Sequence, residues 1–235
     1  MRKLVNAAQS MTLLICGGAA VVAAPPPATE HSYVASLRRL TEQEYRHSIA
    51  DIFGQEIEVR GAFEPTIRAG GLAAASTATL SVTPAGFESF SKMANDIATQ
   101  VTAEKYRSKL PCAPKDAKAP DDACAGKILG HYGLLLFRRP LTDVELKDRV
   151  GLSRRMAEKT NDFYAGMRYS LSMLLQLPDF IFRSEVASNG TLEPYSRATR
   201  LSFFLWNSTP DSELLRRQRA ASLTQARGWQ SRLTG

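Results

Sequence analysis

The sequence predicts an all-α fold, a bundle-like domain of several helices with one long loop. Apolar residues recur at helical spacing in seven segments, and no long alternating pattern typical of a strand appears. Two of these segments begin with Thr followed three residues later by Glu, and two others begin with Thr-Pro; both are frequent signals of a helix N-terminus. Helices with one apolar face each bury it by packing on one another.

Two predicted helices lie in the N-terminal half. The first starts at the Thr41 cap and ends at Gly54, and the second starts at Thr83-Pro84 with an apolar face that runs from Phe87 to Val101. The segment between them, about 55–82, is rich in Gly, Ala, Ser and Thr and forms the predicted long loop. Its diglycine has no preceding strand and no following Lys-Ser/Thr, so we interpret it as a surface loop and not as a phosphate-binding loop.

Five further helices are predicted in the C-terminal half. Their apolar faces or start signals lie at 128–136, 142–159, 163–175, 201–206 and from 209 onward. The helix at 201–206 is expected to carry Leu201, Phe204 and Leu205 on its apolar face. Arginine pairs precede the helix starts at Thr41 and Thr142, and we interpret both pairs as parts of helix junctions.

Residues 1–23 have the pattern of a signal peptide, with two basic residues, a short apolar run and small residues at the end. We expect cleavage after Ala23, a linker at 24–36, and an exported protein in the periplasm, cell envelope or extracellular space. The apolar run is too short to span a membrane stably, so we expect no transmembrane segment after cleavage. Lipidation of Cys16 is the less favoured alternative, because Ile15 stands where a small residue is expected.

Export would leave two cysteines, Cys112 and Cys124, in an oxidising compartment. They flank a polar loop at 111–125, and we predict a disulfide worth roughly 3 kcal/mol to the fold. The sequence has no CxxC pair, no CxxCH haem motif and three histidines. We therefore predict no metal site and no cofactor in this chain.

The net charge of +7 does not indicate a nucleic-acid partner. Its excess comes from seven basic residues in the signal peptide and in residues 216–235, because the remaining 23 basic residues equal the 23 acidic ones. Nucleic-acid binding requires basic residues gathered on a folded face. The tail at 216–235 is basic, has no acidic residue, and is predicted to be unstructured.

Four segments resemble a known family of exported proteins. They read LRRLTEQEYR through DIFG from residue 37, FRRPLT from 137, LPDFIFRSE from 177 and ATRLSFFLWNSTPDSELL from 198. This set is similar to planctomycete-type proteins that contain the domain of unknown function (DUF) 1592 with companion modules of the DUF 1587 and DUF 1595 types.

The resemblance implies an organisation into modules and a set of partners. It implies an N-terminal helical module at 37–110, a central helical module at 126–190, and the start of a C-terminal module at 195–215 that is cut short, so that the chain is interpreted as truncated. The family implies no established activity. It does imply neighbours of the c-type cytochrome or carbohydrate-binding kind.

Charged residues within apolar surroundings are the remaining candidates for a site. We predict a polar cluster of Arg138, Asp179, Arg183, Glu185 and Arg200. Arg139 and Asp211 are charged residues in similar apolar surroundings. Buried charges need partners, so the first interpretation is a set of ion pairs between helices. Arg183 and Glu185, two residues apart, do not share a helix face and are expected to meet different segments. The alternative is a cluster that faces a ligand.

Two functions fit these observations, and no catalytic residue is assigned for either. The first is an exported scaffold or docking module of a multidomain envelope protein linked to redox chemistry or polymer breakdown. The second is the N-terminal part of an exported hydrolase or oxidoreductase whose active site needs a C-terminal part. Mutual burial of the charged residues would favour the first, and an open cleft around Arg183, Glu185 and Arg200 would favour the second.

Overall fold

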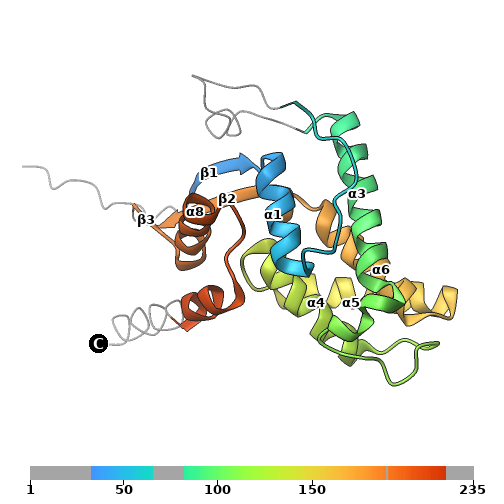
Figure 1. Ribbon diagram of the computed structural model, residues 1–235. Helices are drawn as coiled ribbons and strands as arrows, with labels where there is room; N and C mark the ends of the chain where they lie inside the picture. The colour runs from blue at the N-terminus through green and yellow to red at the C-terminus, as the bar shows by residue number, and fades with distance from the viewer. Residues whose placement is uncertain (1–32, 66–81, 189, 221–235) are drawn as a thin grey trace, which may run out of the picture. The chain divides into compact units, whose positions relative to one another are not determined.

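Helices make up most of the structure, as the sequence predicts (Figure 1). The computed structural model describes residues 33–65, 82–188 and 190–220. The helices are α1 (Glu42–Phe53), α3 (Pro84–Thr102), the 3-10 helix η1 (Glu104–Lys109), α4 (Asp122–Phe137), α5 (Asp143–Thr160), α6 (Phe163–Gln176), α7 (Pro178–Ile181) and α8 (Pro194–Trp206). Residues 212–220 are also helical.

The predicted helix starts are confirmed. Thr41 and Thr142 each accept a bond from the amide of the glutamate three residues on, and that glutamate accepts from the threonine's own amide, so both capping boxes are complete. Thr83 caps α3 by accepting from the Gly86 amide at 3.0 Å, with Pro84 in the first turn. These local contacts fix where α1, α3 and α5 begin.

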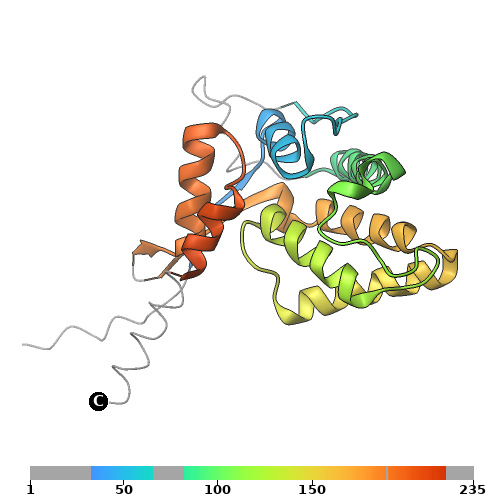
Figure 2. The ribbon, with the colours of Figure 1, turned by 60° about the horizontal axis from the view of Figure 1, so that its bottom comes forward.

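The core lies among α1, α3, α4 and α6, with α5 covering α4 and α6 (Figures 1 and 2). Fully buried side chains include Tyr45 of α1, Ile97 of α3, Ile128 of α4 and Leu171 of α6. Where α5 crosses α6, a Cβ at Gly166 would overlap a main-chain oxygen of α5. The absence of a side chain at this glycine therefore allows the two helices to approach closely.

A small antiparallel sheet was not predicted. Strand β1 (Tyr33–Arg39) pairs with β2 (Phe182–Ser188), which pairs with the short β3 (Thr191–Leu192). Strand β2 does alternate, but its buried face carries Arg183, Glu185 and Ala187. Because charged residues occupy the face that is usually apolar, the alternation does not resemble that of a half-buried strand.

The apolar face expected for the helix at 201–206 is on the outside. Leu201, Phe204 and Leu205 are 47%, 83% and 54% exposed, whereas Phe203 of the same helix is buried. Phe87 of α3 is likewise exposed, although it was expected to lie on the buried face. In α8 the buried face is made largely of small residues, which a pattern of large apolar residues does not identify.

The connecting segments bear out two predictions and correct a third. Cys112 and Cys124 form a disulfide with their Cα atoms 5.5 Å apart. Residues 55–65 of the predicted loop contain no regular helix or strand, and residues 66–81 lie outside the described residues.

The tail prediction is wrong for residues 216–220, which are helical. Residues 221–235 and the predicted signal peptide lie outside the described residues. No helix within the described ranges has the length and apolar composition to cross a membrane.

Candidate binding site

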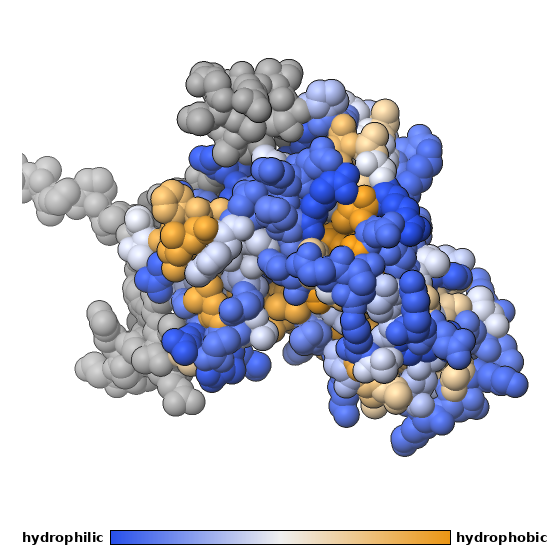
Figure 3. All heavy atoms as spheres, in the orientation of Figure 1, coloured by the Kyte–Doolittle hydropathy of each residue, from blue (hydrophilic) through white to orange (hydrophobic). Residues whose placement is uncertain are grey.

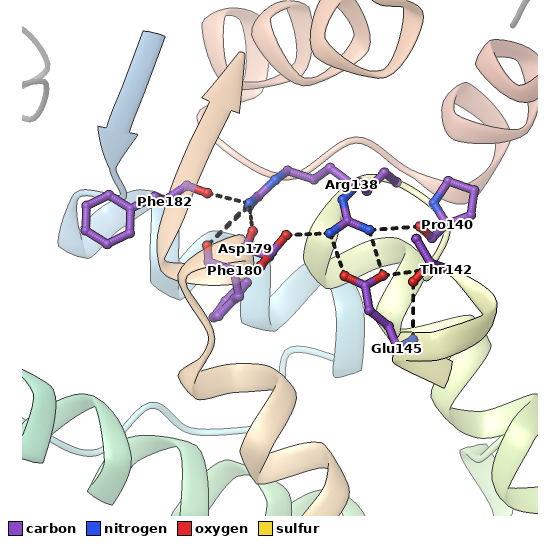
Figure 4. A network of polar contacts seen from close by, with 8 residues as sticks. Arg138, Pro140, Thr142, Glu145, Asp179, Phe180 and Phe182 are labelled. Atoms are coloured by element: carbon purple, nitrogen blue, oxygen red, sulfur yellow. Dashed lines mark hydrogen bonds and ion pairs between the residues drawn. The ribbon is translucent and has the colours of Figure 1, made fainter. Parts of the chain in front are cut away.

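The arginine pair after α4 ties two remote connections together (Figure 4). Arg138 is the C-cap of α4, in the left-handed backbone region at φ 58°, and its side chain is 3% exposed. Its guanidinium donates to the carbonyls of Asp179, Phe180 at 3.3 Å and Phe182 at 2.7 Å. Arg138 therefore meets main-chain oxygens at the α7–β2 junction and not the carboxylate that was expected.

Arg139 makes the carboxylate contacts instead. Its guanidinium donates to both oxygens of Glu145 at 2.9 Å and to Asp179 Oδ1 at 2.6 Å. The contact with Arg139, aided by the Thr142 amide, lowers the pKa of the Glu145 carboxyl to about 2. Burial and the nearby Arg183 charge lower the pKa of Arg138 to about 9, which leaves that guanidinium protonated at neutral pH. The pair clamps the α4–α5 connection to the start of β2.

The first arginine pair ends strand β1. Arg39 is 4% exposed and binds Glu64 Oε2 at 2.6 Å, which holds the beginning of the long loop. Arg38 is the register partner of Arg183 on β2 and lines an open cavity on the sheet. The two motifs therefore share the capping box but differ in what precedes it, a strand in one and a helix in the other.

A cavity of about 610 Å³ opens between the sheet and α8. We call it the β2–α8 pocket. Its described lining consists of charged residues from β1, α1, β2 and α8 together with apolar residues of β3 and α8: Arg38, Glu44, Arg183, Glu185, Leu192, Arg197, Arg200, Leu201, Phe203, Phe204 and Asn207. Its volume is within the range of small-molecule sites.

Two ion pairs lie in the wall of this pocket. Arg183 Nη2 is 3.2 Å from Glu44 Oε1, and both side chains are largely buried, at 10% and 4% exposure. Arg200 Nη2 is 2.7 Å from Glu185 Oε2, with side-chain exposures of 58% and 5%. Each arginine thus has a carboxylate partner from another segment. The side chains of Arg183 and Glu185 nevertheless share one face of β2, because residues two apart on a strand point the same way.

Two buried polar atoms in the pocket have no hydrogen-bond partner among the described residues. They are Nε of Arg183 and Oε2 of Glu185. Arg200 approaches Glu185 Oε2 closely enough for an ion pair, but no N–H of its guanidinium is directed for a hydrogen bond. A buried donor and a buried acceptor therefore lie in the wall of one cavity without a hydrogen bond, a costly arrangement unless something else bonds to them.

The aromatic ring of Phe203 forms the floor next to these charges. The guanidinium carbon of Arg183 lies 4.6 Å from the ring centroid, and that of Arg138 lies 5.9 Å from it. Burial lowers the pKa of Arg183, while the Glu44 carboxylate raises it. Phe203 thus lies close to both the guanidinium of the Arg138 clamp and that of Arg183 in the β2–α8 pocket.

The predicted polar cluster is divided by the structure into two groups. Arg183, Glu185 and Arg200 line the β2–α8 pocket, whereas Arg138 and Asp179 belong to the clamp and line a cavity of about 120 Å³. Asp211 lines neither and caps the helix at 212–220 through the Leu214 amide at 2.7 Å.

Sequence reasoning missed several residues of the pocket, among them Glu44, Arg197 and Phe203. Glu44 had a signal, because it is the last residue of the first capping box, but its second oxygen serves Arg183. Arg197 and Phe203 had none, since their contribution depends on how α8 packs on β2.

The exposed side of α8 carries Leu201, Phe204 and Leu205 within an arc of about 100°, with Trp206 further around the helix, and we call these four side chains the apolar outer face (Figure 3). Leu201 and Phe204 also line the β2–α8 pocket. Trp206 is 61% exposed, and Phe204 is 83% exposed. Leu201 lines the β2–α8 pocket and also a cavity of about 420 Å³ on the side of residues 209–217. Large exposed apolar side chains gathered on one helix are candidates for an interaction site.

Within the described residues, no group of three or more His, Cys, Asp and Glu side chains is placed to hold a metal ion.

Comparison with protein families gives three matches, each to a protein of unknown function: DUF1587 over residues 38–103, DUF1595 over 124–185 and DUF1592 over 192–234. The last match runs to residue 234, well beyond the 195–215 expected for the start of the C-terminal module. No curated protein and no solved structure matches the chain significantly.

Proposed function

We propose that this chain, which belongs to the proteins of unknown function that carry DUF1587, DUF1595 and DUF1592 domains, is an exported docking module of a cell-envelope assembly. Its partner takes part in redox chemistry or polymer breakdown, in the setting of c-type cytochrome or carbohydrate-binding modules. The disulfide between Cys112 and Cys124 supports export, because such bonds persist in oxidising compartments.

The observation that carries the docking role is the apolar outer face of α8. Four of the large exposed apolar side chains of the described residues lie on this helix, at Leu201, Phe204, Leu205 and Trp206. Arg197 and Arg200 flank them on the same helix and are exposed. A partner suited to this face presents an apolar patch bordered by carboxylates, since charge complementarity at the rim directs association.

Site-specific photocrosslinking in the producing cells tests this role. A benzoylphenylalanine at position 204 should crosslink to one discrete envelope protein, and the same group at position 144 should not, although Val144 is 70% exposed and apolar. Mass spectrometry should identify the partner as a protein with a cytochrome or carbohydrate-binding module. Equal labelling from both positions, or no discrete product from position 204, would exclude docking through α8.

Export is tested separately by N-terminal sequencing of the secreted chain, which should begin at Ala24.

The second candidate, part of an exported hydrolase or oxidoreductase, is favoured by the open pocket that Arg183, Glu185 and Arg200 line together. Glu185 is 4% exposed, and one of its oxygens has no hydrogen-bond partner among the described residues although the cavity beside it is open. A buried carboxyl in a cleft is a common arrangement for a general acid or base. The purified full chain should be assayed for hydrolysis or oxidation of envelope polymers. Activity that is lost in Glu185→Gln and kept in Glu145→Gln would establish this function, and activity unaffected by Glu185→Gln would exclude it.

A further inference from the structure

We propose that the β2–α8 pocket binds the carboxyl end of an acylated apolar amino acid, as found at the terminus of a polypeptide or in a free N-acyl amino acid. The carboxylate would accept from arginine, the terminal amide N–H would donate to Glu185, and the apolar side chain would lie on the wall of α8. This inference goes beyond docking through α8, although Leu201, Phe204, Arg197 and Arg200 belong to both surfaces. The titration below tests the cavity in the absence of a docked partner.

The charge of the pocket favours an anionic group. The charged lining residues that β2, α1 and α8 supply are three arginines and two glutamates: Arg183, Arg197, Arg200, Glu44 and Glu185. Arg183 is paired with Glu44, and Arg200 with Glu185, so the charge of Arg197 on the rim is in excess. A planar guanidinium binds a carboxylate well because its fork of N–H groups matches the two oxygens.

Arg183 carries an N–H donor in the wall of the pocket that no described residue uses. Its Nε is buried and has no partner within the described part of the chain, while its Nη2 is engaged by Glu44. Arg200 is 58% exposed at the mouth of the pocket, and its long side chain can turn toward an entering anion without unfolding anything. A carboxylate between Arg183 and Arg200 would complete the bonding of both.

Glu185 decides which kind of anion fits. Its Oε2 makes no hydrogen bond and has the Arg200 guanidinium as its ion-pair partner at 2.7 Å. If Arg200 turns toward an entering anion, Glu185 loses that partner, so the ligand must also bring an N–H or O–H group. Arg183 and Glu185 start from β2 positions about 7 Å apart, which requires an acceptor and a donor on nearby atoms of the ligand. Chloride and sulfate lack the donor, and a cation lacks the acceptor. The terminal residue of a peptide has both, in its carboxylate and its own amide N–H.

The apolar part of the lining accounts for the side chain of that residue. Leu192, Leu201, Phe203 and Phe204 face the cavity from β3 and α8. Phe204 is 83% exposed, so a ligand side chain that covers it removes apolar surface of both partners from water. The cavity of about 610 Å³ has room for a residue as large as phenylalanine.

The test is an NMR titration of the ¹⁵N-labelled mature chain with the disulfide intact. N-acetylphenylalanine should shift the amide signals of residues 183–187 and 197–204. Its carboxamide should bind at least tenfold more weakly because the charge is lost, and phenylpropanoate should bind at least tenfold more weakly because the N–H is lost. Equal affinity for the acid and either analogue, or the same shifts with inorganic phosphate, would overturn the proposal.

Variants locate the effect and separate the two sources of ligand. Arg200→Gln should weaken N-acetylphenylalanine about tenfold, whereas Arg154→Gln, which also breaks a half-exposed ion pair, should leave its affinity unchanged. Unchanged affinity in Arg200→Gln would contradict the assignment. An acetylated tripeptide that ends in phenylalanine should bind more tightly than N-acetylphenylalanine if the natural ligand is a polypeptide end, and equally if it is a free acylated amino acid.

Discussion

Replacing Arg138 with alanine should lower the free energy of unfolding by about 3–5 kcal/mol. Arg138 is 3% exposed and donates to three main-chain carbonyls at the α7–β2 junction. Alanine removes these donors and leaves the oxygens of Asp179, Phe180 and Phe182 without them. The loss falls on the connection that positions β2, and with it one wall of the β2–α8 pocket.

The magnitude follows from the kind of bond that is lost. A hydrogen bond to a charged donor is worth about 1.5–3 kcal/mol, and the three bonds share one guanidinium, so they do not add fully. The left-handed backbone at φ 58° costs a residue other than glycine about 1–2 kcal/mol. Arg138→Gly relieves that cost, so the glycine variant should be about 1 kcal/mol more stable than the alanine variant.

The assay is equilibrium unfolding in urea, followed by circular dichroism with the disulfide intact. Arg139→Ala is the matched control, because the neighbouring Arg139 side chain is 36% exposed and binds carboxylates near the surface. It should cost about 1 kcal/mol. A loss below about 1 kcal/mol in Arg138→Ala would refute the clamp. A glycine variant no more stable than the alanine variant would refute the assigned backbone strain.

Three further outcomes are expected. Reduction of the disulfide, whose cysteines are 12 residues apart, should lower the free energy of unfolding by roughly 3 kcal/mol, seen as a shift of the urea midpoint that an oxidised sample lacks. Arg139 lowers the pKa of Glu145 from 4.5 to about 2, so this pair stabilises the fold above pH 4.5 and the contribution is lost as the pH falls toward 2. Glu145→Gln should therefore reduce the acid dependence of stability by about 0.3–1 kcal/mol, and an unchanged acid profile would disprove the pairing. Gly166→Ala should destabilise by about 1–3 kcal/mol through overlap with α5, whereas Gly130→Ala, with open space at its Cβ, should be neutral or slightly stabilising by thermal melting; a tolerated Gly166→Ala would contradict the close crossing.

The features that the sequence determined are those set by neighbouring residues. Thr41, Thr83 and Thr142 begin their helices where predicted, because each cap needs only the amides of the next turn. The disulfide of Cys112 and Cys124 was also predictable, since two cysteines flanking one polar loop have few other partners. Local chemistry was sufficient in each case.

The sheet and the orientation of α8 required the tertiary structure. Strand β2 buries Arg183 and Glu185, and it is stabilised by pairing with β1 from the other end of the domain. Helix α8 buries Phe203 and small residues, and exposes Phe204. A pattern of large apolar residues predicts the buried face only when burial follows hydrophobicity, and in both elements it does not.

For the candidate site, the sequence determined which residue types stand out, and the tertiary structure decided their partners. Arg138, Asp179, Arg183, Glu185 and Arg200 were identifiable as charges within apolar surroundings. Their division into a clamp and an open pocket depends on contacts between segments far apart in the chain. A buried charge must be compensated, but which group compensates it, a carbonyl for Arg138 or a helix-capping glutamate for Arg183, is set by how those segments pack.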